Sequence, residues 1–467
     1  MKINRRQFFK MASIGSAGIA ATTLTGCNSH TTPPVEPEVT GSGEGIPWRN
    51  WSGSQIAYPG QKLAPANTQE VQEIVAQSEG VIRAVGSGHS FPPLVPTEGT
   101  IMSLSRLSGV VSHDEKLETA QILSGTRLGD MGQLLEDRGQ ALINMPDIDK
   151  QSLAGAISTS THGTGMNFGS LSSYVTALKI VNADGELIEC SADNNPELFS
   201  AARVSLGSLG IITEIEMQNQ QPFRLQNESW AEPIEDLLAK ADQLKDEYRN
   251  FEFYYIPHTD YGIGYGNRET SDTSVVRQPD TSNEDLGTLQ MVNQYLGWSR
   301  GLQKTAISTF MPGSEPQISR DVSWKIYSAQ RNVRFNEMEF HVPMEHGIDC
   351  LKEIIQLVDS DEQNIWFPIE FRYVKQDDIW LSPFYKRDTC SIAVHQYYKD
   401  DYHRLHKAAQ KIFARYHGRP HWGKNHYLQA TDFKKLYPMW DQFQEIRHSM
   451  DPKGKFLNHH LKQVMEG

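Results

Sequence analysis

The sequence predicts an α+β protein of two domains, residues 48–222 and 223–467, which follow a targeting segment at 1–27 and a tether at 28–47. Two observations predict this class. In the first domain, short apolar strands and amphipathic helices alternate with glycine-rich loops, whereas the second carries four strand-like runs interleaved with three helical ones. The chain has 467 residues, 38% of them apolar, which is enough for two hydrophobic cores.

The first domain begins near Trp48 with recognisable local signals. Asn67, with Glu70 three residues later, predicts a helix N-terminus, and the apolar residues that follow recur at helical spacing. Asp184-Gly185 is a favoured tight-turn pair and predicts a hairpin. The other predicted elements are strand 81–85, helix 128–135 closed by Gly139, hairpin strands 174–181 and 187–190, helix 196–203 and strand 211–217.

The second domain is predicted to be an antiparallel sheet with helices on one face. Its strands are expected at 251–256, 335–342, 364–373 and 391–398, and its helices at 233–248, 346–358 and 402–416. We expect about the last 15 residues to pack back toward the first domain. Residues 268–318 are polar at first and then helical in pattern, and the sequence assigns them no role.

The N-terminus has the features of an export signal. Arg5-Arg6 precedes Phe8-Phe9 in a motif typical of the twin-arginine route, and residues 11–24 form a short apolar region. Leu24-Thr25-Gly26-Cys27 resembles a bacterial lipobox with Cys27 as the lipidated residue. We therefore expect a membrane-anchored lipoprotein facing the periplasm or the cell exterior, joined to its anchor by a disordered tether.

Charge and cysteine content exclude several classes of function. The formal net charge is −13 and the basic residues are scattered, so nucleic acid is not an expected partner. Cys190, Cys350 and Cys390 allow at most one disulfide and match no zinc or iron–sulfur spacing, so no metal is expected.

Two loops in the first domain predict an anion-binding site. The first, Val85 to Ser90, is a glycine-rich turn after a short strand and ends in Gly88-His89-Ser90. The second, Gly155 to Gly165, is a run of small and hydroxylated residues that ends in His162-Gly163-Thr164-Gly165. Glycines allow backbone N–H groups to approach an anion, and hydroxyls add neutral donors suited to a pyrophosphate. Neither loop has a Rossmann or Walker spacing.

In this order, the two loops resemble the PCMH-type FAD-binding domain of the vanillyl-alcohol oxidase superfamily. The resemblance implies FAD as cofactor, attached covalently through His89, with no second cysteinyl link because no cysteine lies between Cys27 and Cys190. The cofactor-binding residues it implies are Gly86, Ser87, Gly88, His89, Ser90, Ser152, Gly155, Ala156, Thr159, His162, Gly163, Thr164, Ile212 and Lys424.

Three patterns in the second domain predict a catalytic site. Glu370 and Arg372 alternate along a predicted strand and therefore point to one face, although alone such a pair is usually a solvated ion pair. His395 interrupts an apolar strand, where a structural histidine is the commoner interpretation. Lys424 ends His421-Trp422-Gly423-Lys424, and Asp-Pro-x-Gly-x-Phe-Leu-Asn follows at 451–458.

In this order the three patterns resemble the C-terminal half of the aldonolactone oxidases, whose close relatives are the bacterial alditol oxidases. The resemblance implies that Lys424 stabilises the reduced flavin, that Arg372 and Glu370 bind the substrate, and that His395 contacts or deprotonates its hydroxyl. The function expected is oxidation of a CH–OH group of an aldono-1,4-lactone, with O₂ as acceptor. Three alternatives stay open, namely an alditol substrate, a quinone or cytochrome acceptor, and a catalytically silent binding lipoprotein.

Overall fold

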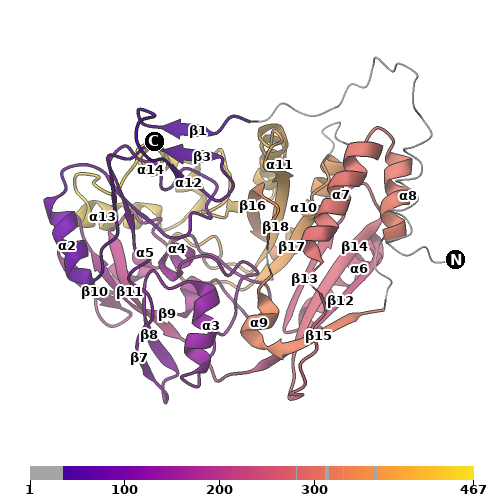
Figure 1. Cartoon of the computed structure of the whole chain (residues 1–467), viewed down its shortest axis with the longest axis horizontal. Coiled ribbons are helices and arrows are strands. Elements are labelled where there is room, and N and C mark those ends of the chain that lie inside the picture. Colours follow the sequence, from indigo (N-terminus) through magenta and orange to yellow (C-terminus); the bar gives the residue numbers. More distant parts are fainter. Residues whose placement is uncertain (1–34, 280, 311–314, 330, 361–364) are drawn as a thin grey trace.

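The computed structural model describes residues 35–279, 281–310, 315–329, 331–360 and 365–467, which form two lobes side by side (Figure 1). The α+β class is confirmed. The tether was expected to be disordered through residue 47, but β1 (Glu38–Thr40) pairs in parallel with β3 (Gln55–Ala57). The backbone N–H of Glu38 donates to the carbonyl of Ser54 at 2.9 Å, so ladder hydrogen bonds order this part of the segment.

The first lobe is built on a five-stranded antiparallel sheet of order β10-β9-β11-β8-β7 and a three-stranded parallel sheet of order β4-β6-β5. The strands are β4 (Gln61–Leu63), β5 (Ile82–Val85), β6 (Thr100–Ser103), β7 (Val110–Asp114), β8 (Thr119–Leu123), β9 (Val175–Val181), β10 (Leu187–Ser191) and β11 (Ile211–Gln218). β2 (Trp48–Arg49) pairs with β3. The helices are α2 (Thr68–Gln77), α3 (Leu128–Glu136), α4 (Leu153–Ser158) and α5 (Pro196–Ala202), with a 3₁₀ turn η1 (Leu171–Tyr174).

The N-terminus of α2 is capped as the sequence predicts. The Asn67 side chain accepts a hydrogen bond from the backbone N–H of Glu70 at 2.9 Å, and the Glu70 carboxylate accepts one from Ala66 at 2.7 Å. Reciprocal capping satisfies backbone donors that the first helical turn leaves unpaired. The cap fixes where the chain enters the helix that covers the parallel sheet through Val71 and Val75.

The end of the chain returns to the first lobe. Helices α12 (Ala430–Leu436), α13 (Trp440–Met450) and α14 (His459–Met465) bury Phe433, Phe443 and Leu461 in the same core as the five-stranded sheet. The backbone N–H of Ile82 also donates to the carbonyl of Lys455 at 2.9 Å. The returning segment is therefore longer than the 15 residues expected, and the first lobe is discontinuous in sequence.

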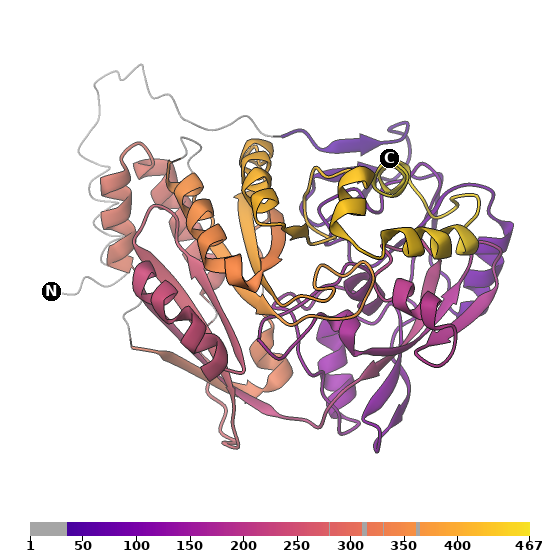
Figure 2. The same ribbon diagram turned by 180° about the vertical axis from the view of Figure 1, so that it is seen from behind.

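The second lobe is an eight-stranded antiparallel sheet of order β15-β12-β14-β13-β17-β18-β16-β19. Its strands are β12 (Arg224–Pro233), β13 (Asn250–Tyr255), β14 (Tyr261–Glu269), β15 (Gln317–Val322), β16 (Phe335–Pro343), β17 (Ile369–Val374), β18 (Thr389–Tyr397) and β19 (Arg419–Pro420). Helices α6 (Ile234–Glu247), α10 (Gly347–Ser360) and α11 (His403–Arg415) cover one face, the near face in Figure 2. A short helix α9 (Ser323–Tyr327) follows β15, and a 3₁₀ turn η2 (Met344–His346) precedes α10.

The two faces of this sheet have opposite character. On β13, Phe251, Phe253 and Tyr255 pack against the covering helices, whereas Glu252 and Tyr254 point to the other face. Helices α7 (Ser282–Leu296) and α8 (Arg300–Phe310) pack over part of that other face, which the expectation of helices on one face alone did not include. The sheet therefore presents a polar surface that is enclosed between α7 and the first lobe.

Within the described residues, no helix is long and apolar enough to span a membrane. Cys190, Cys350 and Cys390 are buried and free, so the one disulfide that the sequence allowed does not form among them.

Candidate active site

Residues of both sequence loops line one cavity in the first lobe. Val85 to Ser90 leaves the end of β5, and the second loop begins with the short helix α4. Nine of the predicted cofactor residues line this cavity: Gly86, Ser87, Gly88, His89, Ser90, Ser152, Gly155, Thr159 and Ile212. The sequence had placed these residues in one site, and the fold brings them together.

At two glycines the cavity wall has no side chain, so a bound dinucleotide could approach the backbone closely. A Cβ atom on Gly86 would lie 2.0 Å from Ser152 Oγ and 3.0 Å from Ser152 Cβ, so any larger residue would force the Ser152 side chain to move. Gly210 has φ +152°, and a Cβ atom there would lie 2.4 Å from the carbonyl of Val181. The hydroxyls of the lining serines and threonine add neutral donors, so the residues fit a phosphate-bearing cofactor such as FAD.

His89 stands beside this cavity as a neutral imidazole. Its ring stacks on Trp51 with centroids 5.4 Å apart. Burial, together with the positive charge of Lys424, lowers the pKa of His89 to about 4. At neutral pH the ring therefore keeps an unprotonated nitrogen, which is the form that can act as a nucleophile.

A second cavity of about 330 Å³ lies between the lobes, over the polar face of the eight-stranded sheet. Lys424, Arg372, Glu370 and His395 all line it. The loop that carries Lys424 contacts the histidine loop directly, because the backbone N–H of Phe91 donates to the carbonyl of Gly423 at 3.0 Å. Lys424, which lines the second cavity, is thereby held near the loop that lines the first: its Nζ lies 5.3 Å from the centroid of the Phe91 ring, and its charge acts on His89.

Arg372 is the centre of a buried ionic network. Its Nε atom donates to Glu252 at 3.1 Å, and its Nη2 atom donates to Asp147 at 3.3 Å and also to Glu370. The Tyr254 hydroxyl donates to the same Glu370 oxygen that accepts from Arg372. One planar guanidinium thus holds carboxylates from β13, β17 and the 145–151 loop in fixed positions.

Glu252 carries a proton part of the time at neutral pH. Burial raises its pKa to about 7, and the neighbouring Glu370 and Asp147 charges act in the same direction against the opposing effect of Arg372. The carboxyl group can therefore donate as well as accept a hydrogen bond near pH 7.

Lys424 and His395 share Glu337 as a partner. Lys424 Nζ donates to Glu337, and His395 Nε2 lies 3.6 Å from the other Glu337 oxygen. Burial opposes the charge of Lys424, but Glu337 and Glu339 outweigh it and raise the pKa of the ammonium group. Lys424 is therefore a fixed cation in the cavity wall.

The geometry around His395 sets its tautomer. Its Nδ1 atom lies 3.0 Å from the carbonyl oxygen of Pro368, which can only accept, so Nδ1 carries the proton. Burial, and the nearby Lys424 charge, lower the pKa of His395 to about 4. The Nε2 atom therefore has a free lone pair at neutral pH, and this atom can accept a proton.

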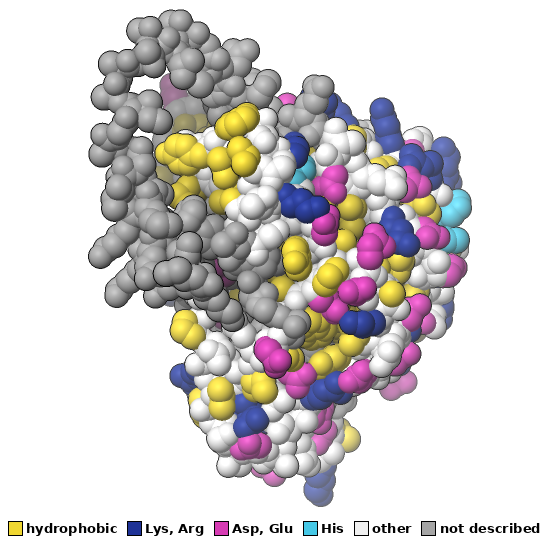
Figure 3. All heavy atoms as spheres, turned by 90° about the vertical axis from the view of Figure 1, so that its right-hand side faces the viewer, with side chains coloured by type: hydrophobic (Ala, Val, Ile, Leu, Met, Phe, Trp, Pro, Cys, Tyr) yellow, Lys and Arg dark blue, Asp and Glu magenta, His cyan; other side chains and the backbone are white. Residues whose placement is uncertain are grey.

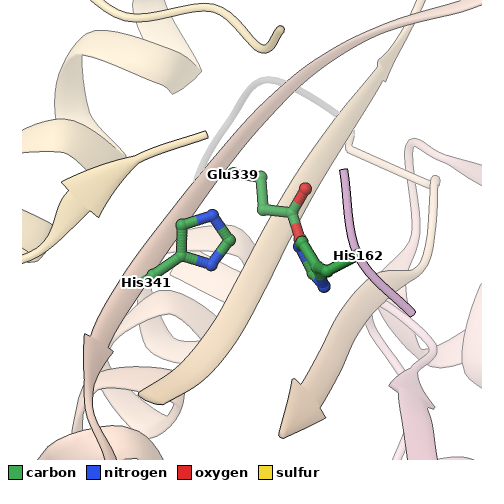
Figure 4. Close-up of side chains that lie close together, drawn as sticks. All are labelled: His162, Glu339 and His341. Carbon is green, nitrogen blue, oxygen red and sulfur yellow. The ribbon is translucent and has the colours of Figure 1, made fainter. Parts of the chain in front are cut away.

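Five predicted cofactor residues lie outside the first cavity. Gly163, Thr164 and Lys424 line the second, and Ala156 is buried in the core of the first lobe. His162 lines neither cavity. Its Nδ1 atom lies 2.7 Å from the Gly163 carbonyl, and its Nε2 atom lies 3.1 Å from Glu339 Oε1, beside the His341 ring (Figure 4).

The contacts of His162 place it beside Glu339 rather than in a cofactor cavity. Two groups of three residues bring ligand atoms within 4.8 Å of one another, so each group could hold a metal ion. One is His162, Glu339 and His341, and the other is Glu337, Glu370 and His395. Neither trio was recognised from the sequence.

Several lining residues were missed from the sequence. They are Asp147, Glu252, Tyr254, Arg331 and Glu337. The available signal was alternation: Glu337 and Glu339 alternate with Met338 and Phe340 along a strand that is buried on both faces. Polar side chains at period two in such a strand indicate a polar cavity, because buried charges need partners.

Comparisons with known proteins match both halves of the chain to families. The profile of an FAD-binding domain matches residues 59–191, and that of the D-arabinono-1,4-lactone oxidases matches residues 215–464. The L-gulono-1,4-lactone dehydrogenase of Mycobacterium tuberculosis is 34% identical over 90% of this chain and 99% of its own. The L-gulonolactone oxidase of Bos taurus is 29% identical over 90% and 98%.

Two further similarities bear on substrate and fold. The alditol oxidase of a Streptomyces species is 24% identical over 90% of this chain and 99% of its own. The crystal structure of cholesterol oxidase from B. sterolicum superposes with a TM-score of 0.73 over 90% of this chain and 96% of that one. At 16% identity this last likeness concerns the fold alone.

Proposed function

This chain belongs to the D-arabinono-1,4-lactone oxidase family, and from that membership we propose that it oxidises the hydroxyl-bearing carbon of a neutral aldono-1,4-lactone. It is an FAD-dependent oxidoreductase that acts on CH–OH groups. The identity of the lactone and of the electron acceptor is the proposed part.

The observation that carries the substrate proposal is the charge of the second cavity. Its lining has three permanent cations, Lys424, Arg331 and Arg372, but five carboxyl groups: Asp147, Glu252, Asp285, Glu337 and Glu370. Because the carboxyl groups outnumber the cations even when Glu252 is protonated, an anionic substrate would be repelled. A neutral polyhydroxylated molecule can instead use these carboxylates as acceptors and Arg372 as a donor.

The chain's own residues can perform the proton half of the oxidation. FAD, when bound, supplies the acceptor for the hydride that leaves the carbon. We assign the hydroxyl proton to Nε2 of His395, because that atom has a free lone pair and lines the cavity. Glu337, 3.6 Å away, would then stabilise the imidazolium as it forms.

Lys424 and the Arg372 network would have separate roles in the reaction. Lys424 lines the second cavity and its charge acts on His89 in the first, so this fixed charge would stabilise negative charge that develops on the cofactor side. Arg372 and Glu370 are held rigidly by their ion pair and would orient the substrate hydroxyls.

The experiment that tests this function is a turnover assay with an artificial electron-accepting dye, which leaves the natural acceptor open. The panel contains aldono-1,4-lactones, alditols and aldonates. We expect the lactones to give the highest kcat/KM. If alditols are preferred by tenfold or more, the alditol alternative replaces the lactone; if only a hydroxy acid reacts, the substrate proposal fails.

The acceptor is proposed to be O₂. The alternatives are a quinone and a cytochrome. Repeating the assay without dye in an oxygen electrode distinguishes O₂ from both of them. Oxygen consumption with peroxide formation at a rate comparable to the dye reaction supports an oxidase. Flavin that stays reduced in air contradicts it.

We also propose that FAD is bound covalently through His89. The support is the neutral imidazole beside the cofactor cavity and the matching loop in the superfamily that the sequence resembles. In-gel flavin fluorescence should persist after SDS denaturation and disappear in a His89→Ala variant. Complete release of flavin from the wild-type protein would show that the attachment is non-covalent.

Export and anchoring are proposed from the sequence, since residues 1–34 lie outside the described part of the structure. The twin-arginine route exports folded proteins, which suits a chain that must acquire its cofactor in the cytoplasm. Replacing Arg5 and Arg6 with lysines should retain the protein in the cytoplasm, and Cys27→Ser should move it from the membrane to the soluble fraction. Unchanged fractionation of both variants would contradict the proposal.

A further inference from the structure

Three large apolar side chains are exposed together where α7 turns into α8. Tyr295 is 66% exposed, Trp298 75% and Leu302 48%. We call these three residues the hairpin tip. Figure 3 shows apolar side chains gathered on this side of the molecule, where α7 and α8 lie. Exposed aromatic side chains at one turn, rather than scattered singly, mark an interaction surface.

The sequence of the α7–α8 hairpin differs in charge from the rest of the chain. No aspartate or glutamate lies between Asp285 and Glu315, although the chain has 57 acidic residues and a net charge of −13. The two charged residues in the interval are basic: Arg300 lies between Trp298 and Leu302, and Lys304 follows the tip and pairs with Asp260. A lipid surface is compatible with this composition, because carboxylates are the groups that an anionic headgroup region repels.

The indole of Trp298 can enter an apolar phase without leaving a polar group unpaired. Its Nε1 atom already donates to the carbonyl of Tyr295 at 3.0 Å, so its one polar group is satisfied within the turn. Tryptophan and tyrosine are also the side chains that concentrate at membrane interfaces.

The position of the tip relative to the start of the chain favours a membrane over a protein partner. The turn between α7 and α8 lies at the top of Figure 1, the same side of the molecule as β1. Val35, where the described chain begins, follows Cys27 by eight positions. Eight residues span at most about 28 Å, so an acylated Cys27 would hold this side close to the bilayer.

We propose that the hairpin tip inserts into the lipid interface to which the N-terminus is anchored. This proposal rests on the anchor proposed above, and it adds a second, non-covalent contact that orients the enzyme. Because Leu286 and Leu289 of α7 line the substrate cavity, the docked hairpin would also place that cavity next to the bilayer.

The test uses the mature acylated protein on phosphatidylcholine vesicles whose acyl chains are brominated, since bromine quenches tryptophan that reaches it. We expect quenching in the wild-type protein and loss of one component of it in Trp298→Phe. In the unacylated Cys27→Ser protein, where no anchor masks the change, the triple variant Tyr295→Ser, Trp298→Ser, Leu302→Ser should bind the vesicles about tenfold more weakly or worse.

The matched control is Val111→Ser with Leu117→Ser, which removes two side chains that are 55% and 66% exposed in the first lobe. The control should leave quenching and binding unchanged. Equal quenching in wild type and Trp298→Phe, or equal binding of the triple variant, would overturn the proposal. So would a triple variant that changes only the sedimentation of the protein, because the tip would then join two copies.

The two proposals can fail separately. Mass spectrometry of the mature protein reports the acyl chains on Cys27. If they are present and Trp298 is not quenched, the anchor stands and the docking fails. If they are absent and Trp298 is quenched in protein mixed with the vesicles, the docking stands and the anchor fails.

Discussion

Replacing Arg372 with lysine separates the shape of this side chain from its charge. The guanidinium contacts Glu252 at 3.1 Å, Asp147 at 3.3 Å and Glu370, and it is buried. A lysine keeps the positive charge, but its single ammonium group cannot reach partners on two sides at once. Removing the charge altogether would instead take this partner from one buried carboxylate, Glu370, and two partly buried ones, and would confound stability with activity.

The magnitude follows from the hydrogen bonds that a lysine cannot form. A hydrogen bond to a charged group contributes about 1.5–3 kcal/mol. If lysine forfeits one such bond of Arg372 and the substrate orientation that depends on it, the rate of flavin reduction should fall by about ten- to hundredfold. Stability should fall by less than for a neutral substitution, because the carboxylates keep a cation beside them.

The assay is stopped-flow flavin reduction under anaerobic conditions, with Arg277→Lys as control. Arg277 also makes two hydrogen bonds to one carboxylate, at 2.9 and 2.6 Å to Asp321, but it lies outside the cavity lining. The control should reduce its flavin at the wild-type rate. If Arg372→Lys is equally fast at all substrate concentrations, the guanidinium does not orient the substrate and the proposed site is wrong.

The same geometry leads to three further predictions. Glu337→Gln removes the carboxylate beside Lys424, so the pKa of the Lys424 ammonium group should fall. Flavin reduction by this variant should then slow as pH rises, and a pH profile identical to the wild type would contradict this prediction. Gly86→Ala should lower the flavin content of the purified protein because its Cβ would clash with Ser152, whereas Gly80→Ala, where nothing lies within 4 Å, should not. Burial lowers the pKa of His406, His421 and His426 to about 3, below the unfolded value near 6.5. The stability that these neutral histidines contribute is therefore present above pH 6.5 and is lost as pH falls toward 3. Tm should drop between pH 7 and 5, and a constant Tm would refute this prediction.

The site was partly accessible from sequence because some of its residues stand in local motifs. Glu370 and Arg372 share a face of one strand, and Lys424 ends a distinctive turn, so their types and spacing indicated chemistry. Glu252 and Asp147 carry no such motif, since each becomes functional only through a contact with Arg372 more than a hundred residues away. Such long-range pairs cannot be read from local periodicity.

The fold was predicted best where hydrophobic periodicity is strong. The amphipathic pattern of residues 402–416 gave α11, and the hairpin around Gly185 formed as its turn chemistry required. Residues 268–318 were not assigned, because α7 has no buried stripe as clear as that of α11. The return of α12, α13 and α14 to the first lobe depends on long-range packing, and only its last part was expected.

The central claim is that a neutral sugar lactone is oxidised in the cavity where Arg372, His395 and Lys424 meet. The most direct test compares one aldono-1,4-lactone with the aldonate formed by its hydrolysis, which has the same carbon skeleton and one negative charge. Each is mixed anaerobically with the oxidised holoenzyme while the flavin absorbance is followed. We predict rapid bleaching by the lactone and none by the aldonate. Bleaching by the aldonate at a rate equal to or above that of the lactone would contradict the claim.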